Sequence, residues 1–188
     1  METNNLPGMI MLKGHKVDLV LVERSDLQIV RDWFNDSDFA GEFEPFRQEN
    51  LTLLEKQFDG KTEATWFFIQ KKDGTKIGYM EPFKVGDNFG IGYTLVPGER
   101  GKGYGTEAVQ IMVDYLFLHK NIARIQAETH PDNIASQRVL EKAGFKKEGI
   151  IRKSFFSRGV WRDTAMFSIL RDEWNAPKVL PLGHTQNQ

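Results

Sequence analysis

The sequence contains no cysteine. This absence excludes a disulfide-bonded scaffold, a thiolate zinc site and a cysteine nucleophile, and we expect no bound metal. Apolar runs are also short, and none approaches the ~20 residues that span a bilayer. The N-terminal METNNLPGMIML lacks the basic segment and the small-residue cleavage site of a secretory signal. We therefore expect a cytoplasmic protein that does not contact membranes.

Neither sign of charge is in clear excess, and the net charge is -1. Because nothing in this balance favours a polyanion, we expect no nucleic-acid partner. The distribution is uneven, however, with eight acids and three bases in residues 31–60 and eight bases and two acids in residues 138–162. This asymmetry indicates either two solvated faces of opposite sign or a site that receives an anion at one end and a cation at the other.

The length of 188 residues suits a single domain, which we place at residues 10–175. The ends of the chain, residues 1–9 and 176–188, are rich in Asn, Gln, Pro and Gly. We expect these termini to be loosely ordered.

Alternating apolar and polar residues predict strands, and a 3.6-residue periodicity predicts helices. The predicted strands span residues 15–23, the two arms around Asp73–Gly74, 88–96, 124–129, 145–156 and 163–170. The predicted helices span residues 24–36, 49–60, 104–119 and 132–145. Hairpins and strand–helix alternation occur together. This combination predicts the α+β class, with a mixed central sheet of about seven strands, antiparallel in its N-terminal part and flanked by about four helices.

Residues 96–108, VPGERGKGYGTEA, contain four glycines between a predicted strand and a predicted helix. A Walker A loop is excluded, because Gly101–Lys102 is followed by glycine rather than serine or threonine. The segment GYGTEA fits the dinucleotide-binding fingerprint, and Glu128 lies at a suitable distance for a ribose-binding acid. Three antiparallel strands before the motif argue against that fold, but an NAD(P)-binding oxidoreductase stays an alternative.

The bare backbone of this segment also suits a different ligand. Main-chain amides at a helix N-terminus bind a pyrophosphate without magnesium, and Arg100 and Lys102 would add charge at the rim. The edge of the preceding strand suits an extended chain that carries amides. Coenzyme A combines a pyrophosphate with such a chain and is therefore compatible with the segment.

The same segment resembles motif A of the GNAT acetyltransferases, Q/R-x-x-G-x-G/A, with Arg100, Gly103 and Gly105 at the defined positions. Residues 133–152, NIASQRVLEKAGFKKEGIIR, resemble the second conserved block of that superfamily. Residues 161–174, WRDTAMFSILRDEW, are similar to the branch that acetylates the N-terminal amino groups of ribosomal proteins. The order of elements also agrees, so the resemblance extends over the whole predicted domain and implies a GNAT fold.

The resemblance implies an N-acetyltransferase that moves the acetyl group of acetyl-CoA to a primary amine by direct attack in a ternary complex. It implies that the strand before the loop pairs with the pantetheine arm and that the loop amides hold the pyrophosphate. Arg138 and Lys142 would meet the 3′-phosphate, although they also fit a solvated helix face. The implied coenzyme-binding residues are Tyr93, Leu95, Val96, Arg100, Gly101, Lys102, Gly103, Tyr104, Gly105, Thr106, Asn133, Arg138 and Lys142.

Asn133 and Ser136 are the implied catalytic residues. Both also suit the start of a helix, where asparagine and serine are common caps. Many GNAT enzymes carry a tyrosine four residues after the position of Ser136 that protonates the departing thiolate, but this chain has Leu140 there. The resemblance to the ribosomal-protein branch implies that the Ser136 hydroxyl takes this role and hydrogen-bonds the sulfur as charge develops.

The acceptor is expected beside residues 39–50, FAGEFEPFRQEN, where acidic and aromatic side chains suit a cationic amine. The expected acceptor-binding residues are Glu42, Phe43, Glu44, Phe46 and Glu81. The general base stays open among Glu81, Glu99 and Glu107. The acceptor is either a protein N-terminus or a small amine, and the protein is either a monomer or a homodimer. A coenzyme A-binding module without catalytic activity is a further alternative.

Overall fold

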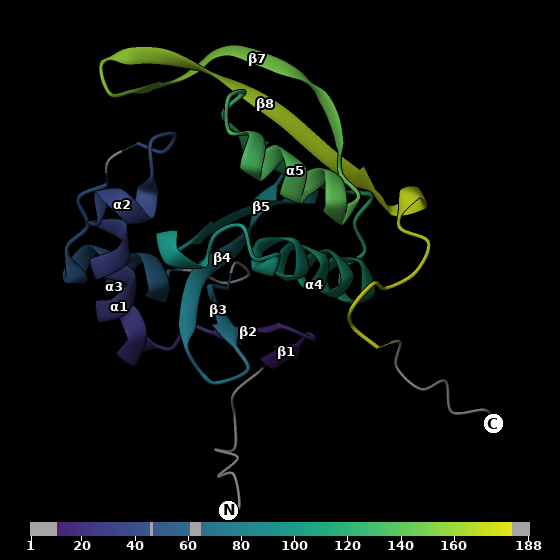
Figure 1. The fold of residues 1–188 in the computed structure, drawn as a ribbon, viewed down its shortest axis with the longest axis horizontal. Coiled ribbons are helices and arrows are strands. Elements are labelled where there is room, and N and C mark those ends of the chain that lie inside the picture. The colour runs from purple at the N-terminus through teal and green to yellow at the C-terminus, as the bar shows by residue number, and fades with distance from the viewer. Residues whose placement is uncertain (1–10, 46, 61–64, 182–188) are drawn as a thin grey trace, which may run out of the picture.

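The computed structural model describes residues 11–45, 47–60 and 65–181. These residues form a mixed eight-stranded sheet with the strand order β1-β2-β3-β4-β5-β6-β8-β7 (Figure 1). The strands are β1 (Met11–Lys13), β2 (Val17–Leu21), β3 (Phe67–Lys71), β4 (Lys76–Val85), β5 (Asn88–Leu95), β6 (Arg124–Thr129), β7 (Lys146–Ser157) and β8 (Val160–Leu170). The helices are α1 (Leu27–Phe34), α2 (Ser37–Ala40), α3 (Leu51–Asp59), α4 (Tyr104–His119) and α5 (Ile134–Ala143). The predicted α+β class with a mixed sheet is confirmed.

The described chain has one strand and one helix more than expected. The additional strand is β1, whose three residues are too few to show alternation in a sequence. It forms because Met11–Lys13 pairs antiparallel with β2. The additional helix is α2, four residues long, which begins where the Asp36 carboxylate accepts a hydrogen bond from the Asp38 amide.

The sheet is antiparallel from β1 to β5, as expected for its N-terminal part. β5 and β6 then pair in parallel, and β8 and β7 continue the sheet antiparallel to its edge. The ladder between β3 and β4 is irregular. Ile69 pairs with Gly78 and Gln70 with Lys76, so Ile77 is an additional residue on β4. Such a bulge shifts the alternation of the side chains that follow it.

Each face of the N-terminal half of the sheet carries its own core. Phe67 and Ile69 of β3 belong to the cluster that α4 and α5 cover, whereas Phe68, between them, belongs to the cluster of α1–α3. Figure 1 shows α4 across one face of the sheet and α1–α3 grouped beside one end of it. The β7–β8 hairpin arches over α5 toward α2, so segments far apart in the sequence approach each other there (Figure 1).

The two ends of α5 follow local sequence signals. The Asn133 side chain accepts a hydrogen bond of 3.1 Å from the Ser136 amide at the N-terminus. Gly144 follows the helix with a φ of 107°, and the Phe145 amide donates to the Leu140 carbonyl over 3.0 Å. The left-handed ending depends on the glycine alone, and the start depends on Asn133. Because both ends of α5 follow from adjacent residues, the position of Ser136 in the first turn is determined locally.

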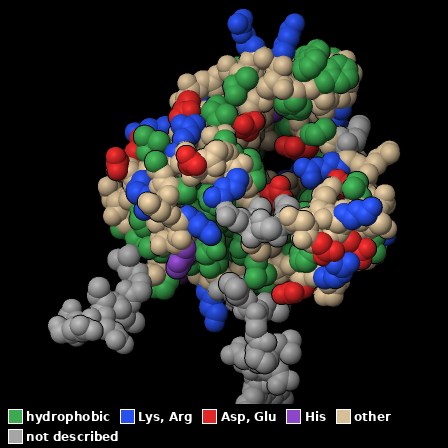
Figure 2. Space-filling view, turned by 180° about the vertical axis from the view of Figure 1, so that it is seen from behind, with side chains coloured by type: hydrophobic (Ala, Val, Ile, Leu, Met, Phe, Trp, Pro, Cys, Tyr) green, Lys and Arg blue, Asp and Glu red, His purple; other side chains and the backbone are tan. Residues whose placement is uncertain are grey.

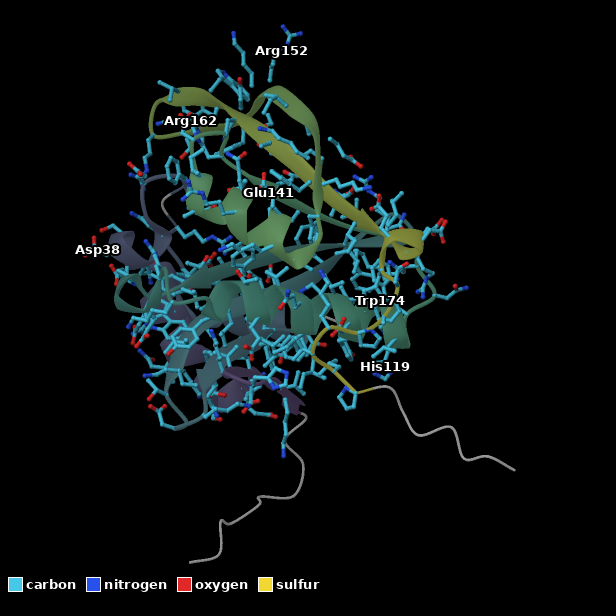
Figure 3. All side chains as sticks on the ribbon, turned by 45° about the vertical axis from the view of Figure 1, so that its right-hand side comes forward. Asp38, His119, Glu141, Arg152, Arg162 and Trp174 are labelled. Carbon is cyan, nitrogen blue, oxygen red and sulfur yellow. The ribbon has the colours of Figure 1, made fainter. Side chains whose placement is uncertain are left out.

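Most of the two termini that were expected to be loosely ordered lies outside the described residues. Of residues 176–188, the structure describes residues 176–181. The amides of Lys178, Val179 and Leu180 donate to the buried Asp114 carboxylate of α4 over 2.7–3.0 Å. The side chain of Trp174 donates to the same carboxylate and lies against α4 (Figure 3). This part of the C-terminal segment is therefore held to the helix.

Within the described ranges, no helix is both long and apolar enough to cross a membrane. These ranges also contain no cluster of three or more histidine, aspartate or glutamate residues arranged to hold a metal ion.

Candidate functional site

A cleft of about 930 Å³ lies among α1, α2 and the segment after it, β4, β5, the glycine-rich segment and α5. Figure 2 shows the hollow below the β7–β8 hairpin, with charged side chains at its rim. One end, which we call the loop end, is formed by one side of α5 and by residues of the glycine-rich segment, namely Arg100, Gly101, Gly103, Gly105 and Thr106. Lys102 and Tyr104, which were expected here, do not line the cleft. The other, the acidic end, is formed by Glu42, Glu44, Glu81 and Glu128 with the aromatic residues around them. The loop end includes basic side chains, whereas the acidic end includes carboxylates. The cleft therefore suits two ligands of different charge.

β5 and β6 separate beside the cleft. Their parallel ladder is limited to Phe89 and Gly90 on β5. From Ile91 to Leu95, no described strand pairs with β5 on the β6 side. Backbone N–H and C=O groups that are left open at a strand edge can pair with another extended chain.

The register of β5 against β4 determines which backbone groups face this gap. The Val96 amide donates to the Ile77 carbonyl of β4 over 2.9 Å. Because the direction of hydrogen bonding alternates along an antiparallel strand, the backbone groups of Tyr93 and Leu95 point the opposite way, into the gap. Val96 was expected to pair with the same ligand as these two residues, but its amide is already used within the sheet.

The glycine-rich segment turns sharply because two of its glycines adopt left-handed backbone conformations. Gly101 has a φ of 77° and Gly103 a φ of 86°, a region that residues with a Cβ rarely occupy. Gly103 is the N-cap of α4 and has no side chain that caps the helix. The amides of Tyr104, Gly105 and Thr106 therefore start the helix without an intrahelical acceptor and remain suited to an anion.

Arg100 lies at the loop end, but its guanidinium is turned toward the protein. Its Nε donates to the Leu95 carbonyl over 2.9 Å. Its Nη2 donates to the carbonyls of Asp38 and Phe39 over 3.1 and 2.8 Å. Arg100 was expected to add charge at the rim of a pyrophosphate site, whereas these three bonds make it a brace between β5 and α2.

Lys102, the second expected cation of the loop, is exposed and pairs with Glu99 over 2.9 Å. This hydrogen bond lowers the pKa of Glu99, which makes Glu99 a poor proton acceptor. Exposed pairs of this kind contribute little to stability, so Lys102 remains free to reorient toward an anion.

A cation that sequence reasoning missed lies beside the loop. The Nζ of Lys16 is 3.5 Å from the point that a Cβ on Gly103 would occupy. Lys16 belongs to the turn between β1 and β2, whose amides at His15, Lys16 and Val17 donate to the Glu107 carboxylate over 2.6, 2.6 and 3.2 Å. Glu107 is thus buried and engaged in a structural role, which removes it as a general-base candidate. No local signal in the sequence relates Lys16 to Gly103.

Ser136 and Tyr93 meet at the middle of the cleft. The Tyr93 hydroxyl lies 3.0 Å from Ser136 Oγ and also donates to the Ser136 carbonyl over 3.4 Å. Burial raises the pKa of Tyr93 to about 12, although the hydrogen bond to Ser136 acts in the opposite direction. The phenol therefore keeps its proton at neutral pH. Tyr93 was expected to contribute only its backbone. The contact of its side chain with Ser136 was not predicted and is seen only in the tertiary structure.

Asn133, Arg138 and Lys142 also line the cleft, all from α5 or its cap. The Asn133 side chain is used to cap the helix. Arg138 and Lys142 are exposed at the rim, four residues apart and on one side of the helix. Their positions are compatible with a bound phosphate and equally with a solvated face.

The acidic end contains most of the residues expected to face the acceptor. Glu42, Phe43 and Glu44 line the cleft, whereas Phe46 lies outside the described residues. The ring of Phe43 stacks on His130 at a centroid distance of 5.1 Å. Desolvation of the carboxyl raises the pKa of Glu44, although the residue as a whole is exposed, and the charge of Arg47 acts in the opposite direction.

Glu81, also expected here, lines the cleft from β4. One of its carboxylate oxygens, Oε2, accepts a hydrogen bond of 2.6 Å from the hydroxyl of Tyr79. Sequence reasoning missed Tyr79, although a separation of two residues on a predicted strand places both side chains on one face. Of the three general-base candidates, Glu81 is therefore the one that lines the cleft.

The tip of the β7–β8 hairpin closes over the acidic end. The Arg158 guanidinium donates to the carbonyl of Gly41 and, over 3.3 Å, to that of Glu44. Arg158 itself has a φ of 52° in the tight turn between the strands. The hairpin thereby holds the segment after α2 in place, a contact between residues more than 110 positions apart.

Comparison with known proteins agrees with this arrangement. A family model described as "Acetyltransferase (GNAT) domain" matches residues 16–146. The probable N-acetyltransferase YjcK of Bacillus subtilis is 49% identical over 131 residues, which cover 68% of this chain and 72% of that protein. Spermidine N(1)-acetyltransferase of Escherichia coli is 26% identical over 181 residues, covering 91% of this chain and 95% of that protein.

Two solved structures illustrate the shared fold. The ribosomal-protein-S5-alanine acetyltransferase from Vibrio fischeri has a TM-score of 0.75 at 25% identity, over 89% of this chain and 100% of that one. Spermidine N-acetyltransferase from Vibrio cholerae, in complex with CoA and spermine, has a TM-score of 0.76 at 22% identity, over 85% of this chain and 98% of that one. The resemblance inferred from motif A is confirmed by the family match, which covers more than half of the sequence. The chain belongs to the GNAT family of N-acetyltransferases.

Proposed function

We propose that the protein transfers the acetyl group of acetyl-CoA to a primary amine by direct attack of the amine on the thioester. The observation that carries this proposal is the gap between β5 and β6, which ends at the glycine-rich segment. An extended chain with amides fits the open edge of β5, and a pyrophosphate fits the amides at the N-terminus of α4. Coenzyme A has both parts and would use the whole of this end of the cleft.

The donor would be held mainly by backbone. The open groups of Tyr93 and the amide of Leu95 pair with the pantetheine arm, since Arg100 already occupies the Leu95 carbonyl. The amides of residues 101–106 hold the pyrophosphate. Arg138 and Lys142 at the rim meet the 3′-phosphate, and Lys16 beside Gly103 adds positive charge near the loop. The role of Arg100 in this scheme is to shape the loop.

The proposed chemistry forms a C–N bond and breaks the C–S bond of the thioester. The amine nitrogen attacks the carbonyl carbon, and the thiolate leaves and gains a proton. Ser136 donates a hydrogen bond from its hydroxyl to the sulfur as negative charge develops. The amine loses one proton and the thiolate takes one up from solvent, so the step balances. In this step the protonated phenol of Tyr93, 3.0 Å from Ser136 Oγ, turns its proton from the Ser136 carbonyl to that oxygen.

The acceptor would enter at the acidic end. Its amine is protonated at neutral pH and must lose a proton before or during the attack. Glu42 and Glu44 attract the cation, and Glu81 accepts the proton, directly or through water. Relatives named for spermidine and for the alanine of a ribosomal protein both act on amines. Those names support a polyamine or a protein N-terminus as the acceptor.

Calorimetry with acetyl-CoA and a thiol-release assay with an amine panel test this proposal together. The panel comprises spermidine, an aminoglycoside and an alanine-initiated peptide. We expect saturable binding of acetyl-CoA and release of free CoA with at least one amine. The proposal fails if acetyl-CoA does not bind, or if NAD(P) binds in its place. Binding of acetyl-CoA without thiol release across the panel would instead support a coenzyme-binding module without activity.

A further inference from the structure

Tyr79 and Glu81 form a hydrogen-bonded pair on one face of β4. The Tyr79 hydroxyl donates to Glu81 Oε2 over 2.6 Å. The bulge at Ile77 determines which face this is, because it shifts the side-chain alternation of the strand. Ile77 belongs to the cluster under α4 and α5, whereas Tyr79 belongs to the cluster of α1–α3. The bulge therefore turns Tyr79 and Glu81 together toward the cleft.

The hydroxyl of Tyr79 has a fixed position and a fixed protonation state. The residue is 5% exposed. Its ring meets Phe34 and Trp66 edge-on, at centroid distances of 5.0 and 5.9 Å, the arrangement that aromatic pairs prefer. Burial raises the pKa of Tyr79 well above its usual range. The phenol thus remains a hydrogen-bond donor at every pH at which an amine is acetylated.

The opposite side of Glu81 opens onto the cleft. Gly92 of β5 is its cross-strand partner, and a Cβ on Gly92 would lie 4.0 Å from Glu81 Cγ. The absence of that side chain leaves room for a substrate group beside the carboxylate. The other charged groups at this end are Glu42, Glu44 and Arg47 from the segment between α2 and α3 and Glu128 from β6. They come from the walls that face β4, so an amine above Gly92 lies among them.

We infer that Tyr79 is a positioning residue, which holds the Glu81 carboxylate facing the acceptor amine above Gly92. This inference rests on the proposed function, in which Glu81 takes up the proton of the amine. An unrestrained glutamate samples several rotamers, and only some of them present the carboxylate to the cleft. The hydrogen bond from a rigid phenol removes this freedom, so a larger fraction of ternary complexes is ready to react. Tyr79 acts through Glu81 rather than on the substrate.

A double-mutant cycle tests this role with Tyr79→Phe, Glu81→Ala and the two combined. Tyr79→Phe keeps the buried ring and removes one hydrogen bond to a charged group. We expect kcat/KM for the best amine of the panel, spermidine or the alanine-initiated peptide, to fall about tenfold. The Kd of acetyl-CoA and the Tm should remain close to the wild type. In the Glu81→Ala background, Tyr79→Phe should have no further effect.

Tyr115→Phe is the matched control, because it removes a hydroxyl from a half-buried tyrosine of α4 that packs against the core, away from the residues that line the cleft. It should leave kcat/KM unchanged. A tenfold loss from Tyr79→Phe in both backgrounds would show that Tyr79 acts independently of Glu81 and would overturn the inference. So would the absence of any loss in the single variant. If the wild type releases no thiol with any amine, the proposed function and this inference fail together.

Discussion

The loop end of the cleft is built mainly from backbone, whereas the acidic end is built from side chains. At the loop end, two glycines in left-handed conformations and the open edge of β5 present main-chain groups from one stretch of sequence. At the acidic end, Glu44, Glu81 and Glu128 come from three separate elements. Main-chain groups keep their positions when most side chains of the loop are replaced, except at the glycines. A cluster of carboxylates loses one binding group with each replacement. The donor site should therefore be robust to substitution, and the acceptor site readily altered by it.

The largest effect is expected where the two ends meet, at Ser136. Ser136→Ala removes the hydroxyl proposed to stabilise the leaving sulfur, so we expect kcat to fall about a hundredfold. The Kd of acetyl-CoA should stay nearly the same, because the loop amides remain in place. Steady-state kinetics with calorimetry on the same variant separate these quantities. An unchanged kcat would remove Ser136 from the mechanism and leave Tyr93 as the nearest proton donor.

An intermediate effect is expected from Gly103→Ala, which tests the backbone character of the loop end. A Cβ at a φ of 86° is strained, at a cost of about 1–3 kcal/mol, and the loop should relax away from its binding conformation. We expect the Kd of acetyl-CoA to rise about tenfold, with the KM of the amine little changed. Calorimetry measures the first quantity and the thiol-release assay the second.

Gly74→Ala is the matched control for this strain. Gly74 has a φ of 88° in the turn between β3 and β4, with nothing within 4 Å of its added Cβ. Both variants should lose similar stability in thermal unfolding, but only Gly103→Ala should lose affinity. Equal loss of affinity in the two variants would mean that general destabilisation, and not the loop, controls binding.

The smallest effect is expected at the hairpin, whose tip holds the acceptor segment. Arg158→Met removes the hydrogen bonds to the carbonyls of Gly41 and Glu44. We expect the KM of the amine to rise about threefold, equivalent to roughly 0.7 kcal/mol, without a change in the Kd of acetyl-CoA. Arg152→Met, on the same hairpin but pointing outward (Figure 3), serves as the control. A rise in the Kd of acetyl-CoA would show that the two ends are coupled through the hairpin.

Most of the fold was predictable because the signals are local. The alternation of β2 to β5 and the periodicity of α4 and α5 extend over enough residues to be recognised. The strand β1 was not, since its three residues form a strand only by pairing with β2. Likewise, the four-residue α2 depends on the Asp36 cap and on the bonds from Arg100 to Asp38 and Phe39.

Some residues of the site could be predicted from the sequence and others could not. The expected residues of α5 and most of those of the glycine-rich segment line the cleft, but Lys102 and Tyr104 do not. Arg100 and Val96 differ from the expectation. The side chain of Arg100 is hydrogen-bonded to α2, and the amide of Val96 is hydrogen-bonded to β4. A linear sequence shows which groups are present, but it does not show which have partners within the fold.

By itself, the sequence determined the family and the position of the glycine turn before α4, because left-handed glycines and helix starts depend on a few adjacent residues. Only the tertiary structure decided which side chains act together. The Tyr93 hydroxyl reaches Ser136 across 43 positions, and Arg158 reaches the segment after α2 across more than 110. Even the pair of Tyr79 and Glu81 faces the cleft because of a bulge at Ile77. Such contacts follow from strand register and packing, which no local pattern specifies.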